Sequence, residues 1–271
     1  MELSRHRYQE MSYLGGGEGE PLLLLHGIPG SALAWKNAGT HLAEQFQVII
    51  PDFRGFGHSD WPHDDYYMKA QAEALKDLLN GLGITSFYLG GHDFGGPVAI
   101  TLMRLFPDFQ VKGVVLSATN VFTDTYVPPP LRLAKVPGLS TIMFAAMAGN
   151  RAGLWMMYQA ATKNKREASW AQFKQHLTPA GMKLTRLIFQ RSLADLQGNY
   201  REVEAMLGRI DIPTLVLWGD RDPFFAPSVG ERIQKAIPES DLTIYTSTGH
   251  FVPEERPREV SKDILAFFAA G

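Results

Sequence analysis

The sequence predicts an α/β fold, with a mostly parallel central sheet flanked by helices on both faces. Short apolar runs bounded by Gly, Pro, Asp or Asn have the length and texture of buried strands. In the first part of the chain they lie at residues 22–25, 48–50, 87–89 and 111–117. Longer patterns with helical periodicity lie between them, at residues 34–45, 68–82 and 96–106. Strands that alternate with helices in this way form parallel sheets, because each helix carries the chain back over a face of the sheet.

The alternation stops after the last of these strands and resumes near the C-terminus. Two further strands and a closing helix are expected at residues 214–218, 242–245 and 257–269. In between, residues 121–207 contain helical patterns rich in Met and aromatic side chains, and no strand pattern. We therefore expect one core made of residues 1–120 and 208–271, with residues 121–207 inserted late in the chain as a helical cap.

The charge balance and the missing cysteines narrow the classes of function. The 271 residues include 26 Lys and Arg against 28 Asp and Glu, so neither a nucleic acid nor a membrane surface is expected as a partner. The absence of cysteine excludes disulfides, thiolate-bound metals and a cysteine nucleophile. No apolar run reaches the roughly 18 residues that span a bilayer. Residues 1–6 lack the apolar core of a signal peptide, so we expect a cytoplasmic protein.

One turn has the composition of a reactive site. Residues 90–96 read Gly-Gly-His-Asp-Phe-Gly-Gly and join the strand at 87–89 to the helix at 96–106. Small residues on both sides suit a tight turn that holds its central residue, Asp93, in a strained conformation above the sheet. Free N–H groups at the start of the following helix stabilise negative charge there. The pattern predicts an ionised, available carboxylate; the alternative is a glycine-rich loop in which Asp93 merely caps a helix.

This turn resembles the nucleophile turn of the α/β-hydrolase superfamily, with Asp93 in the nucleophile position. Three further segments resemble motifs of that superfamily and occur in the same order. They are residues 26–30 (His-Gly-Ile-Pro-Gly), 52–59 (Asp-Phe-Arg-Gly-Phe-Gly-His-Ser) and 248–255 (Thr-Gly-His-Phe-Val-Pro-Glu-Glu). They correspond to the oxyanion segment, a structural loop and the segment of the catalytic histidine. The resemblance covers nearly the whole chain and implies the α/β-hydrolase fold, with residues 121–207 as its cap.

The resemblance also implies the partners of the nucleophile. His250 takes the position of the family's catalytic histidine, and the acid that orients it follows the strand at residues 214–218. The family places this acid three residues after the glycine that ends the strand, which selects Asp222 over the alternative, Asp220. Either carboxylate would hold the imidazole in the tautomer that leaves one nitrogen free as a base.

A carboxylate nucleophile indicates attack on an sp³ carbon. Its attack on an ester carbonyl would give an anhydride-like adduct, whereas attack on an sp³ carbon with a leaving group gives an alkyl ester. His250 would then activate a water that attacks the carbonyl carbon of Asp93. The N–H groups of Ile28 and Phe94 would hold the resulting oxyanion. Epoxides and alkyl halides are the two obvious substrates.

The residues beside the nucleophile favour epoxides over halides. Haloalkane dehalogenases, which this chain resembles, carry Trp directly after the nucleophile and commonly Asn in the oxyanion segment. Here these positions are Phe94 and Ile28, which have no side-chain donor. Haloacetate dehalogenases place arginines beside the nucleophile, where this chain has Phe94 and Pro97. Epoxide hydrolases of this fold protonate the epoxide oxygen with tyrosines of the cap, and residues 199–201 (Asn-Tyr-Arg) are similar to the segment that carries one of them, here Tyr200.

The second tyrosine of that family has no evident counterpart. It usually lies on the first cap helix, but residues 136–148 contain neither Tyr nor His. Tyr158, in an aromatic-rich segment, is our candidate for this second donor. Tyr126 and His176 are alternatives, or Tyr200 acts alone.

We therefore expect an epoxide hydrolase that opens an apolar epoxide to a vicinal diol through an ester on Asp93. Its partners are the small apolar epoxide and water; no cofactor is required, and no histidine pair has the spacing of metal ligands. Phe94, Trp155, Met143 and Met147 are expected to line the substrate pocket. The alternatives are a haloalkane or haloacid dehalogenase with an atypical halide site, and a ligand-binding protein without activity. Both a monomer and a homodimer are compatible with an apolar cap.

Overall fold

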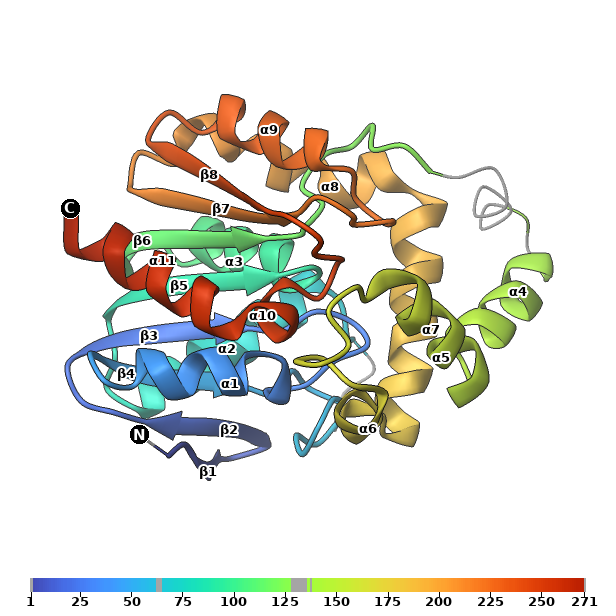
Figure 1. Cartoon of the computed structure of the whole chain (residues 1–271), viewed down its shortest axis with the longest axis horizontal. Helices are drawn as coiled ribbons and strands as arrows, with labels where there is room; N and C mark the ends of the chain where they lie inside the picture. Colours follow the sequence, from blue (N-terminus) through green and yellow to red (C-terminus); the bar gives the residue numbers. More distant parts are fainter. Residues whose placement is uncertain (1, 62–64, 128–135, 137, 271) are drawn as a thin grey trace.

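A computed structural model describes residues 2–61, 65–127, 136 and 138–270 of the chain. Within these ranges the strands form one eight-stranded sheet, in the order β1-β2-β4-β3-β5-β6-β7-β8 (Figure 1). The strands are β1 (Ser4–Tyr8), β2 (Met11–Gly16), β3 (Glu20–Leu25), β4 (Phe46–Pro51), β5 (Ser86–His92), β6 (Gln110–Ser117), β7 (Thr214–Gly219) and β8 (Ser240–Tyr245). Pairs β1–β2 and β2–β4 are antiparallel, and all the others are parallel. The predicted mostly parallel sheet is therefore confirmed, and it contains every strand expected from the sequence.

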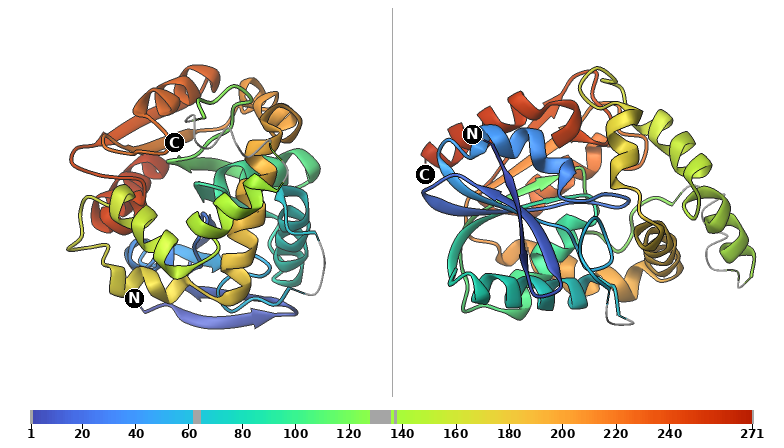
Figure 2. Two further views of the ribbon diagram at one scale, coloured as in Figure 1. Left: turned by 90° about the vertical axis from the view of Figure 1, so that its right-hand side faces the viewer. Right: turned by 90° about the horizontal axis from the view of Figure 1, so that it is seen from below.

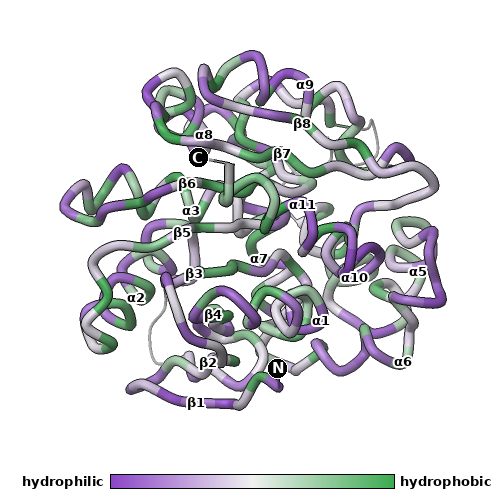
Figure 3. Tube along the Cα trace, turned by 60° about the vertical axis from the view of Figure 1, so that its left-hand side comes forward, coloured by the Kyte–Doolittle hydropathy of each residue, from purple (hydrophilic) through white to green (hydrophobic). Residues whose placement is uncertain are grey.

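The sequence does not predict the first two strands. β1 reads Ser-Arg-His-Arg-Tyr and is largely exposed, so it has no apolar face that would mark it as a strand. It is hydrophilic along most of its length in Figure 3. β1 forms a hairpin with β2 at one edge of the sheet, where charged side chains discourage pairing with another chain.

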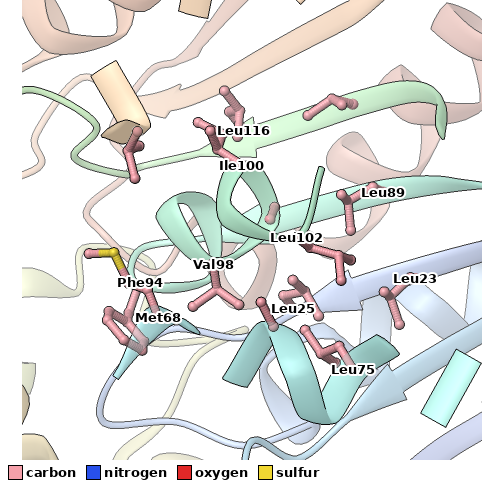
Figure 4. Close-up of a cluster of buried hydrophobic side chains, with 14 of the residues drawn as sticks. Leu23, Leu25, Met68, Leu75, Leu89, Phe94, Val98, Ile100, Leu102 and Leu116 are labelled. Carbon is pink, nitrogen blue, oxygen red and sulfur yellow. The ribbon is translucent and has the colours of Figure 1, made fainter. Parts of the chain in front are cut away.

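Helices cover both faces of the sheet and bury its apolar side chains. The core helices are α1 (Leu33–Leu42), α2 (Met68–Gly81), α3 (Gly95–Leu105), α9 (Pro227–Ala236), α10 (Val252–Glu255) and α11 (Pro257–Ala270). α1 and α11 share one buried apolar cluster with the strands, and α2, α3 and α9 share another. In the second cluster, Met68 and Leu75 lie two turns apart on α2, beside Leu25 of β3 and Val98 of α3 (Figure 4). The helical spacing of apolar residues read from the sequence therefore corresponds to the buried face.

The described residues between β6 and β7 form helices joined by loops and turns, and we call residues 121–207 the insert. Its helices are α4 (Leu139–Met147), α5 (Arg151–Ala161), α6 (Trp170–Phe173), α7 (Pro179–Ala194) and α8 (Leu196–Glu204). Helices α4 to α7 lie beyond the carboxyl ends of the central strands, whereas α8 packs against α3 (Figures 1 and 2). Residues 128–135 and 137 of the predicted cap lie outside the described residues. None of the helices in the described ranges is both long and apolar enough to cross a bilayer.

Glu255 fastens the insert to the loop that carries His250. Its carboxylate is fully buried and accepts hydrogen bonds from the backbone N–H groups of Lys163 and Asn164, both at 2.8 Å, and of Gly249, at 3.1 Å. The N–H of His250 donates to the carbonyl of the last residue of α5, at 2.9 Å. Because the bonds of Glu255 to Lys163 and Asn164 join residues 92 and 91 positions apart, the position of the histidine depends on the insert as well as on the core.

Replacement of Glu255 by Gln should destabilise the protein. Gln has nearly the same size, but its NH₂ group would face backbone N–H donors that lose their acceptor. A buried donor without a partner costs about 1–3 kcal/mol, so we expect the free energy of unfolding to fall by about 2–4 kcal/mol. Urea unfolding followed by fluorescence measures this change.

The matched control is Glu259→Gln. The Glu259 side chain is 51% exposed and pairs only with Arg256 on the surface. Such pairs contribute about 0–1 kcal/mol, so this variant should unfold close to the wild type. Equal losses in the two variants would contradict the role of Glu255.

Candidate active site

Asp93 stands in the turn between β5 and α3, with a positive φ of 51°. The turn is crowded by backbone on both sides. A Cβ atom on Gly91 would lie 2.5 Å from the carbonyl oxygen of Gly95, and one on Gly95 would lie 2.5 Å from that of Leu25. The carbonyl of Asp93 accepts a hydrogen bond from the Thr119 hydroxyl at 2.6 Å. The small residues of the motif are therefore required by close packing, as the sequence pattern suggests.

The carboxylate of Asp93 points at two groups that stabilise its charge. Its Oδ1 accepts a hydrogen bond from the N–H of Ile28 at 2.7 Å, and its Oδ2 lies 3.5 Å from Nε2 of His250. Burial alone would raise the pKa of Asp93, but the hydrogen bond and charge of His250 outweigh it and hold this pKa below its ordinary value. Asp93 is therefore ionised at neutral pH, and the Ile28 N–H predicted for the oxyanion hole lies at its side chain.

His250 bridges Asp93 and Asp222. Its Nδ1 lies 2.9 Å from Oδ2 of Asp222, and Oδ1 of Asp222 accepts the N–H groups of Phe224 and Phe225 at 2.8 and 3.1 Å. Burial lowers the pKa of His250, but the charge and hydrogen bond of Asp222, with those of Asp93, raise it to about 10. In this state the imidazole is a cation between two carboxylates.

The structure brings Asp222, and not Asp220, to the histidine. Oδ1 of Asp220 accepts the N–H of Thr248 at 3.1 Å, and its other oxygen lies 3.5 Å from the Arg221 guanidinium. Asp220 thus braces the loop that leads to His250. His92, next to Asp93 in the chain, donates from Nε2 to the His250 carbonyl at 2.9 Å, since a carbonyl can only accept.

An apolar cavity of about 160 Å³ opens above Asp93 between the core and the insert. Its lining includes Ile28, Asp93, Phe94, Asn120, Phe144, Met147, Met157, Phe189, Ser192, Tyr200, Phe224, Phe225, His250 and Phe251. Phe94 and Met147 line the cavity, as the sequence predicts, but Met143 and Trp155 do not, so the prediction for these two is wrong. Trp155 is 45% exposed because α5 buries positions three and four residues apart, which turns Met157 inward and Trp155 outward.

The two predicted tyrosines lie in different surroundings. Tyr200, on α8, is buried and lines the cavity that contains Asp93. Burial raises the pKa of Tyr200 well above its ordinary value, so the phenol keeps its proton and can act as a donor. Tyr158 does not line the cavity: its hydroxyl donates to the carbonyl of Ala168, and its ring packs on Phe173. The prediction of Tyr158 as second proton donor is therefore wrong.

Of the two alternatives to Tyr158, Tyr126 lies at the cavity and His176 does not. Tyr126 lines the cavity and is 69% exposed. His176 is buried; its Nδ1 lies 2.9 Å from the Ser31 hydroxyl, and its Nε2 lies 3.6 Å from the carboxylate of Glu254. His176 therefore ties the insert to the segments that carry Ile28 and His250, and it does not line the cavity.

Several lining residues were not predicted. Phe224 and Phe225 follow Asp222 directly, and Phe251 follows His250, so adjacency to the catalytic residues could have indicated them. Ser192 and Phe189 lie on α7, and no local pattern distinguishes them from other positions of that helix. In the part of the chain that the structure describes, no group of three His, Asp or Glu side chains is arranged to hold a metal ion.

Comparison with known proteins agrees with this geometry. Residues 20–257 match the family model described as the alpha/beta hydrolase fold. The chain belongs to this family. Lipase 3 of Moraxella sp. is 29% identical over 92% of this chain and 77% of its own length, and human epoxide hydrolase 4 is 27% identical over 94% of this chain and 74% of its own. The structure of the haloalkane dehalogenase DbeA from Bradyrhizobium elkani is similar in fold, with a TM-score of 0.81, 22% identity and 99% of each chain covered.

These relatives are named for different substrates, but all of them are hydrolases. The chain is accordingly a hydrolase of the α/β fold. Which bond it hydrolyses depends on the residues of its own cavity.

The charge of His250 should depend on Asp93. The pKa of His250 in the folded protein, about 10, lies above its ordinary value. The ion pair therefore stabilises the fold fully below about pH 6.5, and this stabilisation is lost as the pH rises through the folded-state pKa. Asp93→Asn removes one negative charge beside the ring, so the pKa of His250 should fall, as measured by NMR titration of the ring signals.

Asp220→Asn is the control for this titration. Asp220 does not contact the imidazole, so its loss should leave the pKa of His250 close to the wild-type value. An unchanged His250 pKa in Asp93→Asn would show that the Asp93 charge does not act on the ring.

Proposed function

We propose that this hydrolase opens small apolar epoxides to vicinal diols through a covalent ester on Asp93. The observation that carries the proposal is an ionised carboxylate in the nucleophile position, with a buried phenol in the same cavity. A carboxylate suits an sp³ electrophile, and a phenol suits a leaving oxygen that needs a proton. The similarity to human epoxide hydrolase 4 supports the same reaction class.

Ring opening is the first step. The carboxylate oxygen of Asp93 attacks one carbon of the epoxide, and the bond between that carbon and the epoxide oxygen breaks. Tyr200 gives its proton to the oxygen that leaves. The products are a hydroxyalkyl ester on Asp93 and a tyrosinate at Tyr200, which later recovers a proton from solvent.

Ester hydrolysis is the second step and uses His250. Formation of the ester removes the negative charge of Asp93, one of the causes that raise the pKa of His250, so the imidazolium loses its proton more readily. The neutral ring then takes a proton from a water molecule, and the resulting hydroxide attacks the carbonyl carbon of Asp93. The oxyanion is held by the N–H groups of Ile28 and Phe94. Its collapse releases the diol, which receives the proton from His250. The carboxylic acid left at Asp93 then gives its proton to the neutral ring, which restores the carboxylate and the imidazolium.

The cavity is a poor site for a halide ion. Among the described lining residues other than His250, the only side chain with an N–H group is that of Asn120, and it donates to the carbonyl of Phe122 at 3.1 Å. A departing halide would therefore find few side-chain N–H donors, whereas the oxygen of an epoxide needs only a proton. The aromatic lining favours an epoxide with an apolar substituent.

A variant that cannot activate water should accumulate the ester. With His250→Gln, styrene oxide should add its mass to the peptide that contains Asp93, detected by mass spectrometry after digestion, while turnover falls by at least about 100-fold. Asp93→Asn in the same assay should gain no mass. Halide release from a chloroalkane without diol formation from any epoxide would favour the dehalogenase alternative, and no adduct with either electrophile would favour a binding protein.

A further inference from the structure

A second hydroxyl group lies beside Tyr200 in the cavity. Ser192, near the end of α7, is only 8% exposed, and it lines the cavity together with Tyr200 and Asp93. Burial raises the pKa of Tyr200, and the neighbouring Ser192 hydroxyl acts against that shift. The helices α4 and α5 of the insert bring no phenol to this point, since α4 has no tyrosine and the Tyr158 hydroxyl is bound elsewhere.

A third hydroxyl group comes from the core. Tyr67 precedes α2 and is only 5% exposed, and its hydroxyl lies 2.8 Å from that of Ser192. Burial raises the pKa of Tyr67 to about 12, and the neighbouring hydroxyl groups of Ser192 and Tyr200 act against that shift. The three hydroxyl groups, which we call the hydroxyl network, therefore join the core to both α7 and α8.

A positive charge lies against this network. The guanidinium of Arg191 stacks over the ring of Tyr67, 4.3 Å from its centroid, and one of its nitrogens lies 3.5 Å from the Asp65 carboxylate. Cations above an aromatic ring are attracted by its π electrons, so Arg191 holds the ring in place. Its charge also favours any negative charge that develops on the hydroxyl network.

Opening of the epoxide ring produces a negative charge that the hydroxyl network can stabilise. When Tyr200 transfers its proton to the epoxide oxygen, its own oxygen becomes an anion in a cavity lined mostly by apolar side chains. A hydroxyl group has one proton to donate and can accept two hydrogen bonds. Because Tyr67 and Ser192 already share one hydrogen bond, Tyr67 can donate to Ser192 while Ser192 donates to the tyrosinate oxygen, and hydrogen bonds to a charged oxygen are the strong ones.

We propose that Ser192 and Tyr67 are positioning residues that make Tyr200 an effective acid without a tyrosine from α4 or α5. This inference rests on the proposed function. In it, the O–H bond of Tyr200 breaks, the proton passes to the leaving epoxide oxygen, and the hydroxyl network stabilises the phenolate that remains. The same network has no part in ester hydrolysis, which belongs to His250.

Single-turnover kinetics with styrene oxide separates the two steps. Ser192→Ala should slow ester formation by about 10- to 100-fold, because it removes a hydrogen bond to a charged oxygen. Tyr67→Phe should also slow ester formation, because Ser192 loses the partner that directs its proton toward Tyr200. The rate of ester hydrolysis should stay within about two-fold of wild type. The control is Ser140→Ala, which removes another buried serine hydroxyl of the insert. This hydroxyl accepts a hydrogen bond from Gln190 and does not line the cavity. The variant should leave the rates of ester formation and ester hydrolysis unchanged.

The outcomes distinguish this inference from the proposed function. Unchanged ester formation in both variants, or an equal loss in both steps, overturns the role of the hydroxyl network while the epoxide hydrolase reaction stands. Restoration of ester formation by Ser192→Thr, which keeps a hydroxyl group, supports it even if Ser192→Ala folds poorly. A wild-type protein that forms neither ester nor diol overturns the proposed function itself.

Discussion

The backbone conformation of Asp93 is the constraint on which the rest of the site depends. A non-glycine residue at positive φ costs about 1–3 kcal/mol and persists only where its surroundings enforce it. Here the N–H of Asp93 donates to the carbonyl of Ser117, and its carbonyl accepts from Thr119, so strand β6 and the segment after it hold both sides of the peptide. The glycines around the turn allow β3 and α3 to approach closely. The side chain consequently leaves the sheet toward the cavity, where the Ile28 N–H and His250 meet it.

The negative charge of Asp93 affects both steps of the proposed reaction. As long as Asp93 is a carboxylate, it and Asp222 keep His250 protonated, and the protonated ring in turn keeps Asp93 ionised and nucleophilic. In the proposed reaction, ester formation cancels the charge of Asp93, and the ring then becomes a base when a base is needed. The order of the two steps thus follows from one ion pair, in which Oδ2 of Asp93 lies 3.5 Å from Nε2 of His250. Asp222 stays charged throughout and keeps the ring oriented.

The sequence predicts those parts of the fold and site that depend on local patterns. The apolar strand runs, the turn at Asp93 and the loop at His250 are contiguous, and each constrains its own backbone. Which face of an insert helix meets the cavity is decided instead by tertiary packing. α5 is apolar around most of its surface, so Trp155 and Met157 are equivalent by composition, and only the packed structure turns Met157 inward. Ser192 and Tyr67 are 125 positions apart, and no local pattern links them.

The central claim is that Asp93, and not water, forms the first bond to the substrate. A single turnover in water labelled with oxygen-18, with enzyme in excess over styrene oxide, tests it most directly. The account predicts an unlabelled diol, because its new oxygen comes from the carboxylate, and label in the peptide that contains Asp93, because water attacks the carbonyl carbon. Label in the diol from this first turnover, with none in Asp93, would show that water attacks the epoxide directly and would contradict the account.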